Sequence, residues 1–256
     1  MQHLHHLPRL ILLILIAALP LGGGPSLFEC AGADSFPVSI ELTLVDDQAI
    51  AYATFQSHNQ KVVSNRNGLF LTYVRESNAD YTAQQWRLAR STDGGKSFAP
   101  VAEGTRATSA PALETSEQGT LFFARPDFKD GNAYLSRLDS LSDAASVTTL
   151  VGGSAGKYCS ALDEPRKQFY YFAHNGTFHV VGIDGQVRQN LQLLEDGEQA
   201  YLQYPHLTLG RDGTLYAAWT TQKRGVYLYR SIHAIKSADG GMAWTTLEGE
   251  PLKTPV

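Results

Sequence analysis

The sequence predicts an all-β fold, a propeller built from about four recognisable four-stranded blades. Two stretches, Ser91–Phe98 and Ser237–Trp244, share the pattern Ser-x-Asp-Gly-Gly-x-small-aromatic. Four pairs of strand-like segments recur about every 50 residues and keep phase with these two stretches. Charged residues make up only 18%, whereas Gly, Tyr and Phe are plentiful, as is usual in turn-rich β proteins. A period of this length with four strands per unit is what a propeller blade requires.

The two shared stretches read as tight turns between strands. Their Asp and Ser side chains can accept hydrogen bonds from nearby backbone N–H groups. The glycine pair supplies positive φ angles without steric cost. We expect the closing Phe98 and Trp244 to pack into the core between neighbouring sheets.

The four strand pairs each consist of a first strand, a polar turn and a second strand rich in aromatic residues. They span Val62–Val74, Ala110–Ala124, Ser160–Ala173 and Pro205–Trp219. Two further strands should follow each pair, and they are clearest at Gln85–Arg90 with Phe98–Val101 and at Val226–Lys236 with Trp244–Leu247. In the middle blades, Asp139–Asp143 and Gly182–Gly185 are candidates for degenerate versions of the Asp-Gly-Gly turn. No helical periodicity competes after residue 34.

The first 33 residues read as a secretory signal peptide, ahead of one propeller domain over residues 34–256. The apolar run Leu10–Leu21 is short for a membrane span, and Ala31-Gly32-Ala33 offers a small-x-small cleavage site. We expect a secreted or periplasmic protein without a membrane association in its mature form; the alternative is an uncleaved anchor. Cleavage before Asp34 removes Cys30 and leaves Cys159 as the one cysteine, so no internal disulfide can form.

The Asp-Gly-Gly turns resemble the Asp box, or BNR repeat, of sialidase-like β-propellers, over about residues 55 to 250. Sialidase-like propellers have six blades and related polysaccharide lyases have seven. The resemblance therefore implies an incomplete six- or seven-bladed ring, truncated at the C-terminus, with Phe36–Tyr52 as a stray outer strand of the closing blade. Such a ring would expose sheet edges.

Topology predicts where a ligand would bind. In a four-stranded antiparallel blade, the loop entering the first strand and the loop after the second strand lie at the same rim, opposite the Asp-Gly-Gly turns. Sites gather where loops converge on a rigid scaffold. The candidates at this rim are His58, Tyr204 and His206 as catalytic residues and Arg75, Arg125, His174 and Arg224 as substrate-binding residues. The alternatives are arginines paired with nearby acids, a polar-loop role for His58 and a core position for His206.

This rim is basic, although the whole chain carries a net charge of −4. Guanidinium groups bind carboxylate or sulfate through two parallel hydrogen bonds, and Tyr and His supply stacking surface and proton transfer. We therefore expect an acidic oligo- or polysaccharide as the partner. The net charge gives no indication of nucleic-acid binding. No metal-ligand cluster, phosphate loop or Gly-x-Ser-x-Gly elbow is present, so no metal or cofactor is expected.

The resemblance leaves three functions open. Sialidases bind the substrate carboxylate with an arginine triad, for which Arg75, Arg125 and Arg224 are available, but the chain has no Arg-Ile-Pro segment. Lyases of the ulvan-lyase-like BNR type use His, Tyr and Arg, and the types of His58, Tyr204, His206 and Arg224 suit that chemistry. The hypotheses are a sialidase-like glycosidase, a polysaccharide lyase on the same scaffold, and a propeller that only binds glycan or protein.

Overall fold

The computed structural model of the chain describes residues 39–55, 58–76, 84–105, 107, 109–127, 130–139, 147–152 and 156–256. The chain divides into two units, Met1–Glu41 and Leu42–Val256. All strands below belong to the second unit. The predicted signal segment and its cleavage site lie outside the described residues. None of the described residues forms a helix that could cross a membrane.

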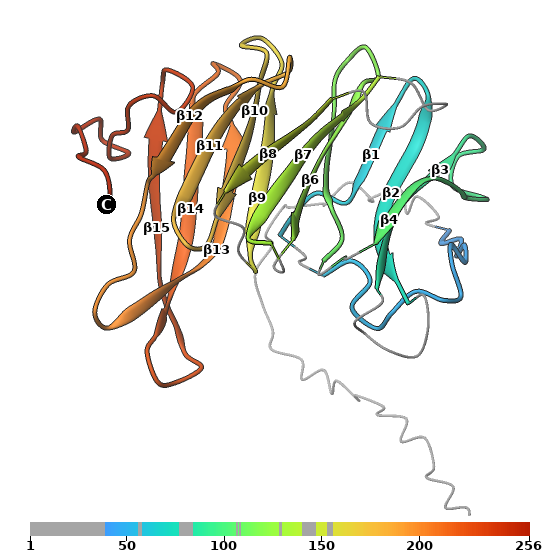
Figure 1. The fold of residues 1–256 in the computed structure, drawn as a ribbon, viewed down its shortest axis with the longest axis horizontal. Helices are drawn as coiled ribbons and strands as arrows, with labels where there is room; N and C mark the ends of the chain where they lie inside the picture. Colours follow the sequence, from blue (N-terminus) through green and yellow to red (C-terminus); the bar gives the residue numbers. More distant parts are fainter. Residues whose placement is uncertain are drawn as a thin grey trace, which may run out of the picture. The chain divides into compact units, whose positions relative to one another are not determined.

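The second unit consists of four antiparallel sheets in which the strands follow chain order (Figure 1). The first sheet contains β1 (Val62–Asn65), β2 (Gly68–Arg75), β3 (Gln85–Ser91) and β4 (Ala99–Thr105). The second contains β5 (Ala112–Thr115), β6 (Leu121–Asp127), β7 (Asn132–Leu138) and β8 (Val147–Gly152). The third contains β9 (Tyr158–Asp163), β10 (Gln168–Ala173), β11 (Thr177–Gly182) and β12 (Val187–Gln192). The fourth contains β13 (Ala200–Leu209), β14 (Leu215–Lys223) and β15 (Tyr229–Ser237).

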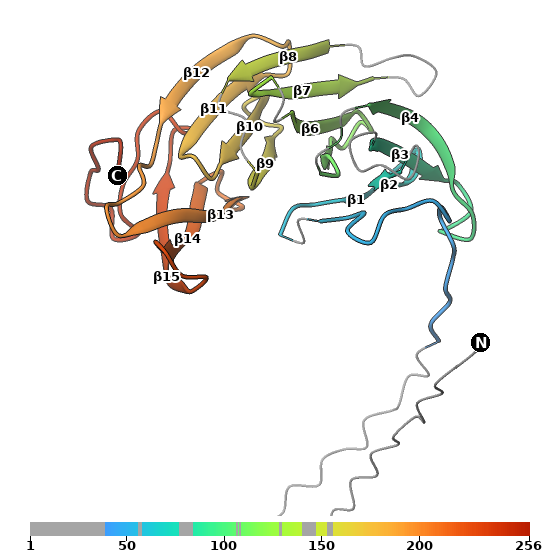
Figure 2. The same cartoon turned by 60° about the horizontal axis from the view of Figure 1, so that its bottom comes forward.

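The first strands of successive sheets are neighbours, because β1 contacts β5, β5 contacts β9, and β9 contacts β13. Figure 2 shows the sheets following one another in chain order along an arc that does not close. This arrangement confirms the predicted all-β, incomplete propeller class. The cavity described below lies along these inner strands.

The fourth sheet differs from its prediction as a four-stranded blade. The predicted strand Trp244–Leu247 is reduced to isolated bridges of Thr245 with Lys236 and with Pro251. A tight turn explains this, because the Thr246 N–H donates to the Glu250 carbonyl at 2.8 Å. The chain then runs back and leaves the sheet edge.

The segment Phe36–Tyr52 also differs from its prediction as an outer strand. Its described residues contain no strand, and Ala49 forms an isolated bridge with Arg75. The Ile50 N–H donates to the Val74 carbonyl at 3.3 Å. The segment therefore borders the end of β2, where β1 no longer pairs with it.

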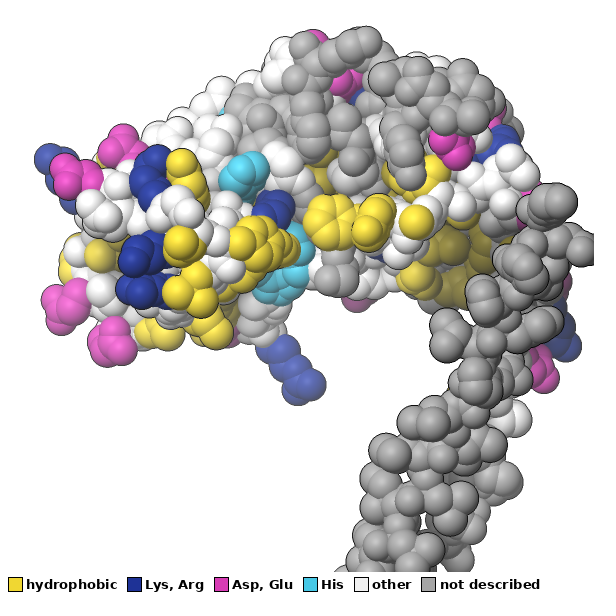
Figure 3. Space-filling model, turned by 90° about the horizontal axis from the view of Figure 1, so that it is seen from below, with side chains coloured by type: hydrophobic (Ala, Val, Ile, Leu, Met, Phe, Trp, Pro, Cys, Tyr) yellow, Lys and Arg dark blue, Asp and Glu magenta, His cyan; other side chains and the backbone are white. Residues whose placement is uncertain are grey.

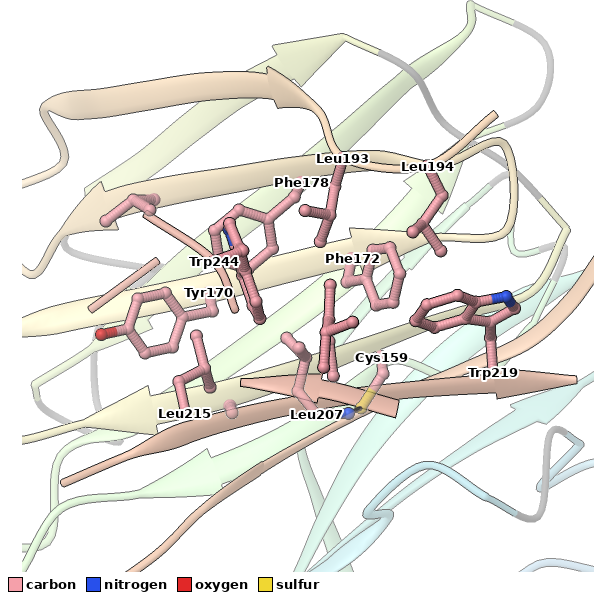
Figure 4. Close-up of a cluster of buried hydrophobic side chains, with 14 of the residues drawn as sticks. Cys159, Tyr170, Phe172, Phe178, Leu193, Leu194, Leu207, Leu215, Trp219 and Trp244 are labelled. Carbon is pink, nitrogen blue, oxygen red and sulfur yellow. Dashed lines mark hydrogen bonds between the residues drawn. The ribbon is translucent and has the colours of Figure 1, made fainter. Parts of the chain in front are cut away.

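The hydrophobic core lies between adjacent sheets rather than inside any one of them. Successive residues of a strand point to opposite faces, so neighbouring residues of β6 enter different clusters: Phe122 faces the third sheet and Phe123 faces the first. Figure 4 shows the cluster between the third and fourth sheets, where Phe172, Phe178 and Trp219 pack among leucines. Each face that a sheet buries is thus covered by the adjacent sheet.

The two Asp-Gly-Gly turns have the predicted local structure. Asp93 Oδ1 accepts hydrogen bonds from the N–H groups of Lys96 and Ser97, both at 3.0 Å. Gly94 and Gly95 have φ angles of 76° and 93°. In the second turn, Asp239 makes the same bonds to the two residues before Trp244.

The closing aromatic residue of the second turn also behaves as predicted. Trp244 is buried and meets Phe178 of the third sheet edge-on, with ring centres 5.3 Å apart. The turn therefore joins two sheets as well as two strands.

Candidate functional site

A cavity of about 370 Å³ lies along the inner strands. It is lined by the loop before β1 and by residues of β5, β9 and β13, namely His58, Asn59, Gln60, Glu114, Cys159, Ser160, Ala161, Leu162, His206, Leu207, Thr208 and Leu209. The inner strands of the second, third and fourth sheets contribute to it, together with the loop that precedes the first sheet. Two of the predicted site residues, His58 and His206, thus share one cavity.

His58 is held at the cavity as a neutral imidazole. Its Nε2 lies 3.2 Å from the Tyr158 carbonyl oxygen, so Nε2–H donates there and Nδ1 carries the lone pair. Nδ1 is buried and has no hydrogen-bond partner among the described residues. Burial, together with the charges of Lys61 and Lys157, lowers the pKa of His58 to about 4. The ring is therefore uncharged at neutral pH.

Lys61 is a buried amine beside this histidine. Lys61 is only 7% exposed, and its Nζ has no hydrogen-bond partner in the described part of the chain. Nζ lies 5.8 Å from the centre of the Tyr158 ring. Burial lowers the pKa of Lys61 to about 7. A buried ammonium without a partner is costly, which makes Lys61 a candidate anchor for an anion.

Glu114 lies in β5 and is the one carboxyl group among the described residues that line the cavity. Burial raises its pKa to about 8. The group is therefore largely protonated at neutral pH and can donate a proton.

His206 is exposed on β13, at the same cavity, with Nδ1 3.9 Å from Cys159 Sγ. The Cys159 thiol is buried, and burial raises its pKa to about 12. The sulfur accepts the Leu207 N–H at 3.3 Å. Because the thiol stays protonated, Cys159 is a packing residue rather than a nucleophile.

A cluster of one lysine and three tyrosines continues the site beyond His58; we call it the lysine–tyrosine cluster, and it consists of Lys157, Tyr204, Tyr227 and Tyr229. Lys157 Nζ lies 4.2 Å from the centre of the Tyr204 ring and 5.7 Å from that of Tyr229. It also donates to Gln203 Oε1. This places a positive charge on the faces of two aromatic rings.

Tyr204 connects this cluster to the cavity. It has a φ angle of 49° and lies where the pairing of β13 with β14 shifts register between Gln203 and His206. The His58 ring meets the Tyr204 ring edge-on, with centres 5.3 Å apart. A bulge can redirect a side chain in this way, so the irregular strand brings the predicted His58 and Tyr204 together.

His174 supports the cluster from the third sheet. The Nδ1 of His174 accepts a hydrogen bond from the Lys157 backbone N–H at 3.0 Å, and the His174 backbone N–H donates to the Lys157 carbonyl at 2.8 Å. Burial lowers the pKa of His174. The predicted substrate-binding histidine therefore fixes the backbone of Lys157 in the structure.

The three predicted arginines each lie against an acidic side chain away from the cavity. Arg75 Nε is 3.4 Å from Asp46 Oδ2. Arg125 stacks over the Tyr134 ring and lies 3.8 Å from Asp127. Arg224 stacks over the Tyr201 ring and lies 3.8 Å from Asp196. Arg75 lies in the first sheet, Arg125 in the second, and Arg224 directly after β14 of the fourth. None of them lines the cavity.

Sequence reasoning did not identify Lys61, Glu114, Lys157, Tyr227 or Tyr229. Lys61 and Glu114 carried a usable signal, because Glu114 interrupts the apolar run before it and Lys61 directly precedes two valines. Charged residues inside such runs are seldom fully buried without a reason. The loop residue Lys157 carried no comparable signal.

Figure 3 looks onto one face of the molecule, where histidine side chains lie beside hydrophobic side chains and a basic side chain. Among the residues that the structure describes, no group of three His, Cys, Asp or Glu side chains is placed to hold a metal ion. The site therefore consists of a cavity with ionisable groups and an adjoining aromatic surface.

No protein-family model and no curated protein matches the chain. Among solved structures, a protein of unknown function from Dyadobacter fermentans has a TM-score of 0.51 at 13% identity, over 80% of this chain and 70% of that one. The bifunctional GH43-CE protein of Bacteroides eggerthii has a TM-score of 0.45 at 13% identity, over 77% and 28%. The xyloglucan PUL GH43B protein of Bacteroides ovatus has a TM-score of 0.43 at 12% identity, over 81% and 42%. The likeness to the Dyadobacter protein shows that this chain shares its fold.

Proposed function

We propose that the chain binds an acidic oligo- or polysaccharide across the cavity and the lysine–tyrosine cluster, and that it cleaves this ligand. One observation carries the proposal. Lys61 and Lys157 lie near His58, and neither forms an ion pair with a carboxylate of the described residues. The three predicted arginines, in contrast, each have an aspartate within 4 Å.

Cations without acidic partners favour an anionic ligand. A carboxylate or sulfate group would compensate the buried Lys61 ammonium, whose Nζ has no hydrogen-bond partner among the described residues. The exposed Tyr227 and the half-buried Tyr204 and Tyr229 offer aromatic faces to sugar rings. The basic groups of the ligand site are then lysines rather than the arginines that the sequence suggested.

Elimination is the reaction that these groups support best. A polysaccharide lyase removes the proton next to a uronate carboxylate, and nearby cations stabilise the charge that develops there. A neutral histidine in contact with a tyrosine, with two lysines nearby, provides groups of the kinds that this reaction needs. The alternative of a sialidase-like arginine triad has less support, because none of the three arginines lines the cavity and each lies against an aspartate.

Hydrolysis is a second candidate, favoured by Glu114. A carboxylic acid with a pKa of about 8 can protonate a leaving group at neutral pH. Most glycosidases also need a second carboxylate across the scissile bond. Glu114 has the one carboxyl group among the described residues that line the cavity. The second carboxylate is therefore missing there, and we rank hydrolysis below elimination.

Calorimetric titration of the full-length protein with uronic-acid, sialylated, sulfated and neutral oligosaccharides tests the proposal. We expect acidic ligands to bind and neutral ones to bind far more weakly. Lys61→Met and Lys157→Met should each weaken acidic binding by about 2 kcal/mol or more, which is roughly 30-fold. Lys96→Met, in the Asp-Gly-Gly turn at the opposite end of its sheet, is the matched control.

The reaction class has its own readout. Elimination produces an unsaturated uronide that absorbs ultraviolet light, whereas hydrolysis produces reducing ends without that absorbance. Equal affinity for acidic and neutral sugars, or full affinity in both lysine variants, contradicts the proposal. The place of action, outside the cell after cleavage near residue 33, remains a proposal from the N-terminal sequence.

A further inference from the structure

The hydroxyl groups of three tyrosines form a continuous chain from Tyr204, whose ring meets that of His58, to solvent. Tyr204 Oη lies 3.3 Å from Tyr229 Oη, and Tyr229 donates to Tyr227 Oη at 2.9 Å. Tyr227 stands at the outer end and is 80% exposed. The chain therefore begins at a ring that touches His58 and ends at a phenol that a ligand can reach.

The charges around this chain favour loss of a proton at its exposed end. The hydrogen bond from Tyr229 is the largest effect that lowers the pKa of Tyr227, and the positive charge of Lys157 acts in the same direction. Burial, together with its hydrogen bonds to Tyr204 and Tyr227, raises the pKa of Tyr229 above its ordinary range. The titratable groups that face Tyr227 are Tyr229, Tyr204 and Lys157, and neutral His58 lies behind Tyr204.

Packing alone does not account for this arrangement. The Tyr227 and Tyr229 rings meet edge-on with centres 5.2 Å apart, which phenylalanines could do equally well. The aligned hydroxyls and the lysine over two of the rings are the additional features. They stabilise a phenolate at Tyr227, in the way that a neighbouring cation and donated hydrogen bonds stabilise any anion.

We propose that Tyr227 is the residue that exchanges a proton with the bound ligand, and that Tyr229 and Lys157 are the positioning residues that keep its phenol reactive. This inference rests on the proposed function and adds a catalytic group to it. In an acidic polysaccharide, the Tyr227 phenolate takes the proton from the carbon next to the uronate carboxylate. The carbon–oxygen bond at the adjacent carbon breaks as the double bond forms, and the proton passes from Tyr227 to the departing sugar oxygen. No oxidant, reductant or further reactant is needed.

The first test needs no substrate. The full-length protein carrying ring-¹³C tyrosine is titrated by NMR, and Tyr227→Phe identifies the signal of interest among the 12 tyrosines. We expect Tyr227 to lose its proton below the ordinary value of about 10. Tyr229→Phe and Lys157→Met should each move that titration upward. A Tyr227 signal that titrates normally, and that neither variant moves, overturns the inference.

The second test separates catalysis from binding. Tyr227→Phe should keep its affinity for acidic oligosaccharides within about twofold, yet lose turnover by about 100-fold or more, as loss of a proton-transfer group does. Tyr52→Phe, at an exposed tyrosine outside the cluster, should change neither. Full turnover in Tyr227→Phe would overturn the inference even if its phenol titrates early.

The two proposals fail separately. Absence of glycan binding in the native protein, with the early phenol titration intact, would remove the proposed function and the proton-transfer role while leaving the activated phenol. Glycan binding and cleavage with a normal Tyr227 titration would leave the proposed function and remove this inference.

Discussion

At the scale of single residues, the buried Lys61 and the partly buried Glu114 change the stability of the fold in opposite directions as the pH rises. Burial lowers the pKa of Lys61 to about 7 and raises that of Glu114 to about 8. Each group is therefore less favourable when charged in the folded chain than when charged in the unfolded chain. A site that retains such groups gives up stability, which is expected where function needs them.

The variant Lys61→Met should stabilise the fold most below about pH 7, because the ammonium is then charged in both states and its full desolvation cost applies. The gain should shrink between about pH 7 and pH 10, where the folded chain has released the proton that the unfolded chain keeps. We expect a gain of about 2–4 kcal/mol at about pH 6 in urea unfolding. A loss of stability at that pH would mean that Lys61 has a partner in the native protein.

The variant Glu114→Gln should behave in the opposite way. The carboxyl group of the folded chain is protonated below its pKa of about 8, and above that pH it is charged in both states at full cost. Gln should therefore raise stability by roughly 1–3 kcal/mol at about pH 9 and change little at about pH 4. Unfolding curves at the two pH values check this, and a gain that is equal at both would contradict the assignment.

At the scale of elements, the Asp-Gly-Gly turns have two separate structural roles. Their Asp and Ser side chains bind backbone N–H groups within the turn, and this part is the same in both copies. Their closing aromatic residues differ, because Trp244 is buried against Phe178 whereas Phe98 is only half-buried. The hydrogen bonds hold the connection between two strands in both copies. In the second copy, the aromatic residue also packs against the adjacent sheet.

We therefore expect Trp244→Ala to destabilise the protein by about 3–5 kcal/mol, the usual cost of removing a buried large aromatic side chain. Phe98→Ala should cost less than half as much, because solvent already reaches that ring. Chemical unfolding of the two variants side by side measures the difference. Equal losses would show that Phe98 is buried as deeply as Trp244.

At the scale of the whole second unit, the open arc leaves a sheet edge without full cover. The strand β15 is the last of the fourth sheet, and outside it the described chain adds only a bridge at Lys236. Ile232, on the same strand, is 84% exposed. Exposed edges with apolar side chains are templates for pairing with another chain.

The protein should therefore self-associate as its concentration rises, and Ile232→Lys should shift it toward the monomer, because a charge on an edge strand opposes pairing. Sedimentation velocity over a range of concentrations measures this. Met242→Lys, at an exposed apolar residue in a turn, is the control and should have little effect. A native protein that stays monomeric throughout would remove the argument from the uncovered edge.

The sequence by itself determined the repeated sheets and their turns. The hydrogen bonds of Asp93 and Asp239 join residues only three or four apart, and the positive φ angles lie at the glycines that permit them. Consecutive apolar residues in strands such as β6 then allow burial on both faces. These properties are local or periodic, so they can be read along the chain. The early end of the fourth sheet could not be predicted in this way, because it depends on the turn at Thr246 and on the packing that follows.

The tertiary structure alone decided which charges meet at the candidate site. His58 and Tyr204 could be chosen by loop position, but a lysine rather than an arginine lies over the Tyr204 ring. Arg75 lies against Asp46, a residue far from it in sequence. The energy of a charge depends on distances through space and on burial, and neither quantity is encoded in spacing along the chain. For that reason the sequence could indicate a basic, aromatic rim, whereas the fold determined which of its cations remain available to a ligand.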